Sequence, residues 1–185
     1  MGQDKALLPF LGEPLIERVI NRVGLLADEL LINTNNPKDY KVFNVPLFKD
    51  ILPGIGALGG LYTALSVCRY PFVIVVACDM PFVNVDILEM SLDMLQANNA
   101  DVVIPKTANG YEPFHAVYRR KTCLPAIKSA MQNGEKRLIS WFSKINILSI
   151  HESHLLVHDP QHIAFMNLNT RQDFVNAELL AKELD

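Results

Sequence analysis

The chain is poor in cysteine and has no long apolar run. Three of its 185 residues are cysteine (Cys68, Cys78 and Cys123), and no two of them form a CxxC pair. An odd number of widely spaced cysteines argues against a disulfide framework and indicates the reduced thiols of a cytoplasmic protein. The longest apolar run, Phe72 to Cys78, is too short to cross a bilayer. The first residues also lack the basic and then apolar pattern of a secretory signal.

The chain carries little net charge. Its formal net charge is −3 and its pI is about 5.9, which argues against a protein that coats a nucleic-acid backbone. Half of the residues are apolar and a fifth are charged, as in ordinary globular proteins. We expect residues 1–185 to form a single domain, and we expect neither a nucleic acid nor a membrane as a partner.

Strand and helix patterns alternate along the whole chain. Phe72 to Cys78 is a continuous, largely β-branched run, typical of a parallel strand buried on both faces. The patterns predict strands at 29–33, 45–49, 72–78, 101–104, 114–118, 145–150 and 165–168. They predict helices at 14–23, 57–68, 86–96, 122–132, 138–144 and 171–182. This alternation predicts an α/β fold of three layers, Rossmann-like, with a mostly parallel sheet and helices on both faces.

Polar residues follow several of these strands, and in such sheets the site lies beyond the carboxyl ends of the strands. Asp79 follows the most buried strand, where a carboxylate suits a Mg²⁺ ion bound to phosphates. It could equally be a helix cap or a turn acid. Asn33 ends another strand, where its amide could read a base or a ribose, although an Asn-rich turn explains it as well.

Asp50 follows the strand at 45–49 and precedes a glycine-rich segment around Gly56. Four glycines within seven residues at the start of a helix allow a ligand to approach the backbone closely. A flexible turn with tight helix packing is the alternative. His115 alternates on a strand, so it could line a substrate cleft or be a satisfied core histidine. Cys78 is better explained by packing than as a nucleophile.

Lys5 lies in the opening segment Met1 to Leu8, three residues after Gly2. A lysine that follows a glycine-containing turn is how many proteins bind a triphosphate, because backbone N–H groups surround the oxygens and the ammonium neutralises their charge. A turn of this kind normally follows a β-strand, and the sequence supplies no residues ahead of Met1 to form one.

Six segments, in order, resemble the molybdenum cofactor guanylyltransferase family of α/β nucleotidyltransferases, and together they span nearly the whole chain. The opening segment, continued by 12–15, is similar to the second half of the family's N-terminal signature. Residues 50–60 resemble its second glycine-rich segment, and 78–82 its metal-binding strand end. The remaining matches are 112–118 on the acceptor side, the loop at 133–137, and the late asparagine motif at 165–170.

The resemblance implies transfer of GMP from GTP to molybdopterin, with release of pyrophosphate. Mg²⁺ would be held by Asp79, and Lys5 would neutralise the triphosphate. Asn33, Asp50 and the backbone around Gly56 would contact the nucleoside.

On the acceptor side, the resemblance implies that Arg137, Asn167 and Asn169 face the phosphate of the pterin. It further implies apo-molybdoenzymes, and a GTP-binding helper protein, as candidate partners.

The chain departs from the family at its amino end. Family members have a strand and a Leu-Ala-Gly-Gly-x-Ser-x-Arg turn directly before the Met-Gly with which this sequence begins. We therefore expect an N-terminally truncated domain whose first central strand is missing. Two neighbouring strands should be left unpaired beside a large apolar slot, at a cost in stability. A misplaced start or a repurposed paralogue would each explain the departure.

Two other functions remain open. A cytidylyltransferase that uses CTP in place of GTP would keep the same mechanism, because the turn that reads the base falls largely in the absent segment. A non-catalytic paralogue that binds the cofactor would bind the pterin without binding Mg²⁺-GTP.

Overall fold

The computed structural model describes residues 4–184, so Met1 to Gln3 of the expected phosphate-binding segment lie outside the described residues. The larger of its sheets has five strands. Its path is β5, β8, β6, β7, and β9 pairs with the other edge of β6. These strands span Phe72–Val76 (β5), Val102–Thr107 (β6), Gly110–Tyr111 (β7), His115–Arg119 (β8) and Ile147–His151 (β9).

Strands β5, β6 and β9 of this sheet run in one direction. β6 pairs parallel with β9, whereas β8 pairs antiparallel with both β5 and β6. The reversal of β8 has a simple cause. β7 and short turns join β6 to β8, and this connection is too short for the crossover that a parallel pair needs.

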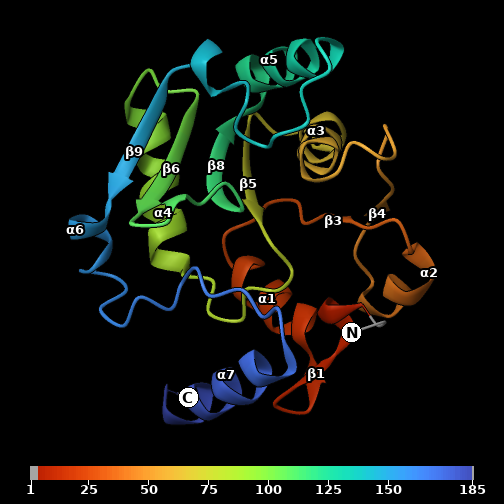
Figure 1. The fold of residues 1–185 in the computed structure, drawn as a ribbon, viewed down its shortest axis with the longest axis vertical. Helices are drawn as coiled ribbons and strands as arrows, with labels where there is room; N and C mark the ends of the chain where they lie inside the picture. The colour runs from red at the N-terminus through yellow and green to blue at the C-terminus, as the bar shows by residue number, and fades with distance from the viewer. Residues whose placement is uncertain (1–3, 185) are drawn as a thin grey trace.

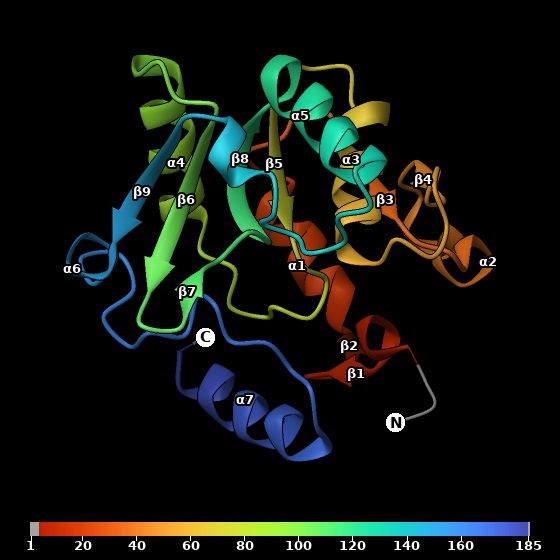
Figure 2. The same ribbon diagram turned by 45° about the horizontal axis from the view of Figure 1, so that its top comes forward.

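A second, two-stranded parallel sheet consists of β3 (Ile32–Asn33) and β4 (Leu47–Phe48). It lies on the side of β5 away from β8, as both views show (Figures 1 and 2). Helix α2 (Pro37–Tyr40) and the 3₁₀ turn η2 (Lys41–Phe43) connect its strands. Both strands are shorter than the sequence pattern predicts.

Helices cover both faces of the sheet, as the sequence predicts. α3 (Ala57–Val67) and α5 (Arg120–Gln132) pack on one face, and α4 (Val85–Ala97) and α1 (Leu15–Val23) lie on the other. A hairpin, β1 (Pro9–Phe10) with β2 (Glu13–Pro14), packs with the C-terminal helix α7 (Arg171–Leu184). Three short elements complete the fold: η1 (Lys5–Leu7), η3 (Phe142–Lys144) and α6 (Glu152–Leu155). Within 4–184, no helix has the length and apolar character that a membrane span requires.

Two expected elements differ from the structure. Residues 165–168 form no strand, because the segment attaches to the rest of the fold through single contacts rather than through a ladder. The Leu168 N–H donates to the Asp79 carbonyl (3.0 Å), and the Phe165 ring packs edge-on against His115. The helix expected at 138–144 shrinks to η3, where the buried indole of Trp141 donates to the Leu138 carbonyl (2.8 Å).

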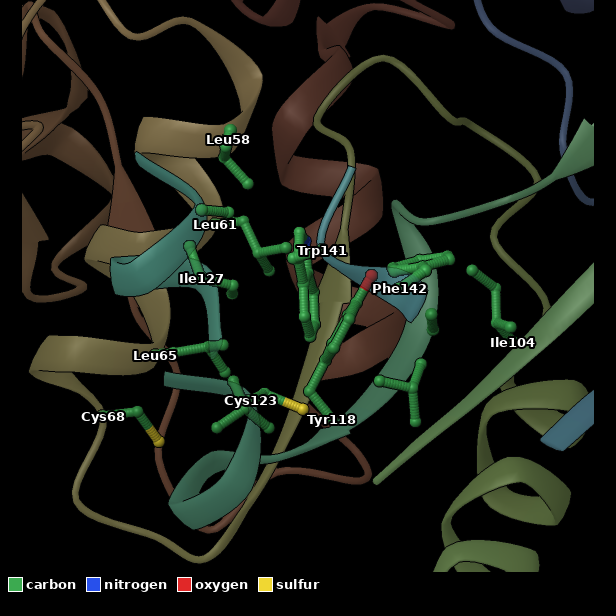
Figure 3. Packing of buried hydrophobic residues seen from close by; sticks show 14 residues of the cluster. Leu58, Leu61, Leu65, Cys68, Ile104, Tyr118, Cys123, Ile127, Trp141 and Phe142 are labelled. Atoms are coloured by element: carbon green, nitrogen blue, oxygen red, sulfur yellow. The ribbon is translucent and has the colours of Figure 1, made fainter. Parts of the chain in front are cut away.

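The largest part of the core lies between the sheet and the pair α3 and α5. Figure 3 shows Tyr118 and Trp141 at its centre, with leucines of α3 to one side. The side chains of β5 alternate between the two faces, so Val73 joins this cluster and Ile74 joins those on the opposite face. Leu65 of α3 is fully buried in it.

Leu65→Ala should lower the free energy of unfolding by about 2–5 kcal/mol, because it opens a cavity that the rigid surroundings fill only in part. Leu179→Ala, on the exposed face of α7 (59% exposed), is the matched control and should cost less than about 0.5 kcal/mol. Urea unfolding of both variants measures the difference. Equal losses would contradict this assignment of the core.

His115 is a core histidine and does not line an open cleft. Its ring is fully buried on β8, and its Nε2 atom accepts a hydrogen bond from the Asn84 N–H (3.1 Å). The proton of the neutral ring therefore resides on Nδ1, which has no partner among residues 4–184. Burial lowers the pKa of His115 from its ordinary value of 6.5 to about 4.

This lowered pKa predicts a loss of stability in acid. Since the unfolded chain takes up a proton below pH 6.5 and the folded chain does not until about pH 4, the stabilisation is complete above pH 6.5 and declines as the pH falls to 4. The total loss should be roughly 3 kcal/mol. His115→Gln keeps an acceptor for Asn84 but cannot titrate, so its free energy of unfolding should fall less between pH 7 and pH 4. Identical pH profiles for the two proteins would refute this origin.

Candidate functional site

Asp79 lies just beyond the carboxyl end of β5, where the sequence predicts it. Its backbone carbonyl accepts from the Leu168 N–H, so the late asparagine segment is bound to the end of the strand. Its side chain is half-buried. Burial raises the pKa of the Asp79 carboxyl, and a hydrogen bond from its own backbone and the nearby Lys5 ammonium oppose that rise.

The loop that follows Asp79 is fixed by side chains from three directions. Arg18 of α1 donates from Nε to the Pro81 carbonyl (3.0 Å), and His115 of β8 accepts from the Asn84 N–H. Asn84 itself caps α4 by accepting from the Ile87 N–H (3.0 Å). These bonds leave the loop little freedom, so the Asp79 carboxylate is held in position before any ligand binds.

Lys5 lies beside Asp79 and contacts the late asparagine segment. Its Nζ atom donates to Asn169 Oδ1 (2.8 Å). The backbone N–H of Asn169 donates to Asp173 at the start of α7 (2.8 Å). This bond and those from Thr170 lower the pKa of Asp173. The structure therefore brings together Lys5, Asp79 and Asn169 from three distant parts of the chain.

Cys78 is a poor candidate for a nucleophile. Although its side chain reaches solvent, desolvation by the surrounding protein raises the pKa of its thiol to about 11, and the carboxylates of Asp79 and Asp4 add to the effect. The thiolate is therefore scarce at neutral pH. Cys78, Cys68 and Cys123 are all free cysteines in the structure.

A second polar cluster joins the ends of β3 and β4. Asp50 accepts from the Asn33 amide at one carboxylate oxygen (2.8 Å) and from the Asn35 amide at the other (2.9 Å). The Asp50 backbone N–H in turn donates to Asn35 Oδ1 (3.2 Å). Two amides thus hold the carboxylate in one orientation. The sequence indicates Asn33 and Asp50 but does not single out Asn35; the two-residue spacing on the Asn-rich turn is the signal for it.

The glycine-rich segment brings α3 close to this second cluster. Gly56 precedes α3 with φ +71°, a conformation that favours glycine. A Cβ atom on Gly60 would lie 3.4 Å from Asn33 Nδ2, tighter than most such contacts. The first turn of α3 therefore opens beside Asn33 and Asp50, and its free N–H groups favour an anion there.

Tyr40 connects the two clusters, and sequence reasoning missed it. Its hydroxyl donates to Asp4 (2.7 Å), the residue directly before Lys5. Burial raises the pKa of Tyr40, and Asp4 and the Cys78 thiol raise it further, while a bond with Thr34 of the Asn-rich turn lowers it. Tyr40 is thus close to the ends of both β3 and β5. No motif marks it, because Asp4 and Cys78 are distant from it in sequence.

Arg137 and Asn167 are not brought into these clusters. Arg137 is exposed between α5 and η3. Its carbonyl accepts from the Ser140 N–H (3.1 Å), but its guanidinium forms no hydrogen bond or ion pair within 4–184. Asn167 is exposed too, and its amide donates to the Phe165 carbonyl (3.3 Å). Of the three residues that the sequence places on an acceptor side, only Asn169 contacts another predicted site residue.

A large cavity of about 590 Å³ lies between β3 and β5. Its walls are mainly apolar, and Asn33 and Cys78 lie among its lining residues. A nucleotide needs polar partners for its base, sugar and phosphates, so the apolar interior does not suit one. The structure thus has a mainly apolar space between β3 and β5, and the absence of a central strand stays an expectation from the sequence.

The site offers few metal ligands of its own. Within the part of the chain that the structure describes, no three His, Cys, Asp or Glu side chains gather as a metal site would require. A lone half-buried carboxylate such as Asp79 does fit Mg²⁺ in a phosphate complex, because this ion keeps several waters and takes oxygens from its substrate.

Comparison with known proteins identifies the family of this chain. Residues 1–147 match the family model described as a MobA-like NTP transferase domain. The molybdenum cofactor guanylyltransferase of Desulfosudis oleivorans is 30% identical over 98% of this chain and 89% of its own length. A probable molybdenum cofactor guanylyltransferase of Clostridium perfringens is 32% identical over 93% of this chain and 86% of its own.

Solved structures show the same fold. The molybdopterin-guanine dinucleotide biosynthesis protein A of Archaeoglobus fulgidus superimposes with a TM-score of 0.84 at 24% identity, over 98% of this chain and 92% of its own. The 2-C-methyl-D-erythritol 4-phosphate cytidylyltransferase of Thermus thermophilus gives 0.73 at 17% identity, over 96% and 94%. The chain therefore belongs to the MobA-like NTP transferase family of nucleotidyltransferases, together with the molybdenum cofactor guanylyltransferases.

Proposed function

We propose that this nucleotidyltransferase moves GMP from GTP to molybdopterin and releases pyrophosphate. The proximity of Lys5, Asp79 and Asn169 at the end of β5 is the main structural support. In the reaction, an oxygen of the molybdopterin phosphate forms a bond to the α-phosphorus of GTP. The bond from that phosphorus to the bridging oxygen breaks, and pyrophosphate leaves with the electron pair.

Lys5 has the position of a charge-neutralising group in this step. Its side chain is half-buried and its Nζ atom is held by Asn169, so its ammonium is oriented before the triphosphate binds. Charge develops on the departing pyrophosphate, and a fixed ammonium stabilises it at little reorganisation cost. The attacking phosphate is already ionised at neutral pH, so the reaction needs no general base.

Asp79 would hold Mg²⁺ together with phosphate oxygens. The bound ion would neutralise phosphate charge and polarise the phosphorus centre. Asp79 is suited to this role because burial disfavours its bare carboxylate, and a cation would compensate for that cost. The hydrogen bonds on the loop after Asp79 keep the carboxylate in place.

The second cluster would bind the nucleoside. Asp50 occupies the amide groups of Asn33 and Asn35, and Asn33 Oδ1 remains available to accept from a base or a ribose. The backbone around Gly56 would approach the sugar and phosphates. On the acceptor side, we assign the pterin phosphate to Asn169, Asn167 and Arg137. We place the reaction in the cytoplasm, with apo-molybdoenzymes and a GTP-binding helper as further partners.

Asp79→Asn and Lys5→Met should each lower kcat by about 10²–10³, because each removes a charge that stabilises the transition state. Asp93→Asn and Lys182→Met change exposed residues of α4 and α7 and serve as matched controls with unchanged kcat. Pyrophosphate release measures activity, and the melting temperature shows that each variant is folded. Wild-type rates for folded Asp79→Asn or Lys5→Met would refute these roles.

With Mg²⁺ and molybdopterin present, we expect pyrophosphate release with GTP and none with CTP. Release with CTP alone would keep the mechanism and change the base. If folded protein released nothing with either nucleotide, bound the pterin and failed to bind Mg²⁺-GTP, a non-catalytic cofactor-binding role would replace the proposal.

A further inference from the structure

β9 is the outermost strand on its side of the larger sheet. β6 pairs with one of its edges, and neither view shows a further strand beyond the other edge (Figures 1 and 2). Helix α4 packs on the face of the sheet to which Leu148 and Ile150 contribute, and α5 packs on the opposite face. The helices therefore flank the outer edge of β9 and do not pair with its backbone.

The backbone groups on this outer edge are unpaired. On the inner edge, Val102 pairs with Ile147, and the Val102 N–H donates to the Asn146 carbonyl. In a parallel ladder, alternate residues of a strand turn their N–H and C=O groups to the same partner, so the even-numbered residues of β9 face β6. The outward groups belong to Ile147, Ser149 and His151. Within residues 4–184, these three N–H groups have no acceptor.

β9 also lacks the features by which exposed edge strands usually avoid pairing. Proline, lysine and very short strands all discourage it. The β1–β2 hairpin contains Pro9 and Pro14. β4 lies between Pro46 and Lys49, and β7 is only two residues long. By contrast, β9 has five residues, and the segment 145–151 contains no proline, lysine, arginine, aspartate or glutamate. Of these strands, β9 is the one suited to pair with another strand.

The outer edge of β9 is complementary to itself. A two-fold axis at Ser149 would set two copies of the strand antiparallel, with Ile147 of each copy opposite His151 of the other. Since these are the residues with outward groups, every free donor would meet a free acceptor. Leu148 would lie opposite Ile150 of the other copy in the non-hydrogen-bonded pairs, where side chains approach most closely. Both side chains belong to the α4 face, so the pairing would extend an apolar cluster.

The ends of β9 suit a second copy as well. In this register Glu152, the first charged residue after the strand, would lie opposite Asn146, so like charges do not meet there. A hollow of about 190 Å³ lies beside the amino end of β9, lined by residues 98–100 and 146–148. His151 and Glu152 of the second copy would lie at this hollow. A second copy therefore uses the hollow as well as the free backbone, whereas an extended peptide of another protein needs only the backbone.

We propose that the outer edge of β9 is a dimer interface, at which a second copy of this chain pairs antiparallel about Ser149. The two larger sheets then form one continuous sheet, with α4 of both copies on the same face. β6 and β8 separate β9 from β5, so each copy keeps its own Asp79 away from the interface. This inference concerns assembly and does not rest on the proposed function.

His151→Pro removes one outward N–H with little strain. The φ of His151 is −75°, close to the value that proline requires, and its N–H does not bond to β6. In the dimer this N–H would donate to the Ile147 carbonyl of the other copy, so the variant loses the bond once in each copy. His151→Gln keeps the N–H and is the matched control. Sedimentation velocity between about 1 and 300 µM measures association, and the melting temperature shows that each variant is folded.

We expect the wild type and His151→Gln to dimerise, and we expect His151→Pro to raise the dissociation constant of the dimer at least about tenfold. In the wild type, amide hydrogen exchange at Ile147 and Ser149 should slow as the protein concentration rises. Leu148 and Ile150, which bond to β6, should stay protected at every concentration.

Two results would overturn the proposal. One is a wild-type chain that stays monomeric up to about 300 µM and exchanges freely at Ile147 and Ser149, which would leave the edge to an extended peptide of another protein. The other is a folded His151→Pro variant whose dimer is as stable as that of the wild type.

Discussion

The pairing of β5 with β8 is the interaction on which the candidate site depends. Its register places Val76 opposite His115, and the buried imidazole then accepts from the loop that follows Asp79. A neutral histidine is needed there, because a protonated Nε2 could not accept this bond. Burial lowers the pKa of His115 and keeps the ring neutral. A hydrogen bond inside the core thus helps to position the loop that follows the half-buried Asp79.

The sequence predicts the layers of this fold well and its loops poorly. Phe72 to Val76 is recognisable because a strand buried on both faces has to be apolar throughout. The sequence pattern does not predict that β8 runs antiparallel to its neighbours, because hydrophobic periodicity indicates which residues are buried and not the direction of a strand. The segment at 165–168 has the composition of a strand, yet it bonds to the end of β5 through a single contact. Only the tertiary fold decides between these outcomes.

The candidate site, too, contains some residues that the sequence predicts and others that it does not. Asp79, Asn33 and Asp50 can be found by position alone, because each follows a strand and the carboxyl ends of strands converge. Tyr40 cannot be found in this way, since its role depends on its hydrogen bond with Asp4, which only folding brings close. Arg137 shows the opposite failure: motif resemblance selects it, and the structure leaves its guanidinium exposed and without a polar contact in the described chain.

The apolar cavity between β3 and β5 borders the candidate site. Changes to the stability of this region would therefore also affect binding at the site. Asn33 and Cys78 line the apolar cavity, while Asn33 is also held by Asp50, and Cys78 precedes Asp79. The spacing between β3 and β5 sets the distance between the two polar clusters, and within the described residues no backbone hydrogen bond spans that gap. Tyr40 contacts both sides of the gap, through Thr34 on one side and Asp4 on the other. In the proposed reaction, a fixed separation of the two clusters would lower the ordering cost of binding.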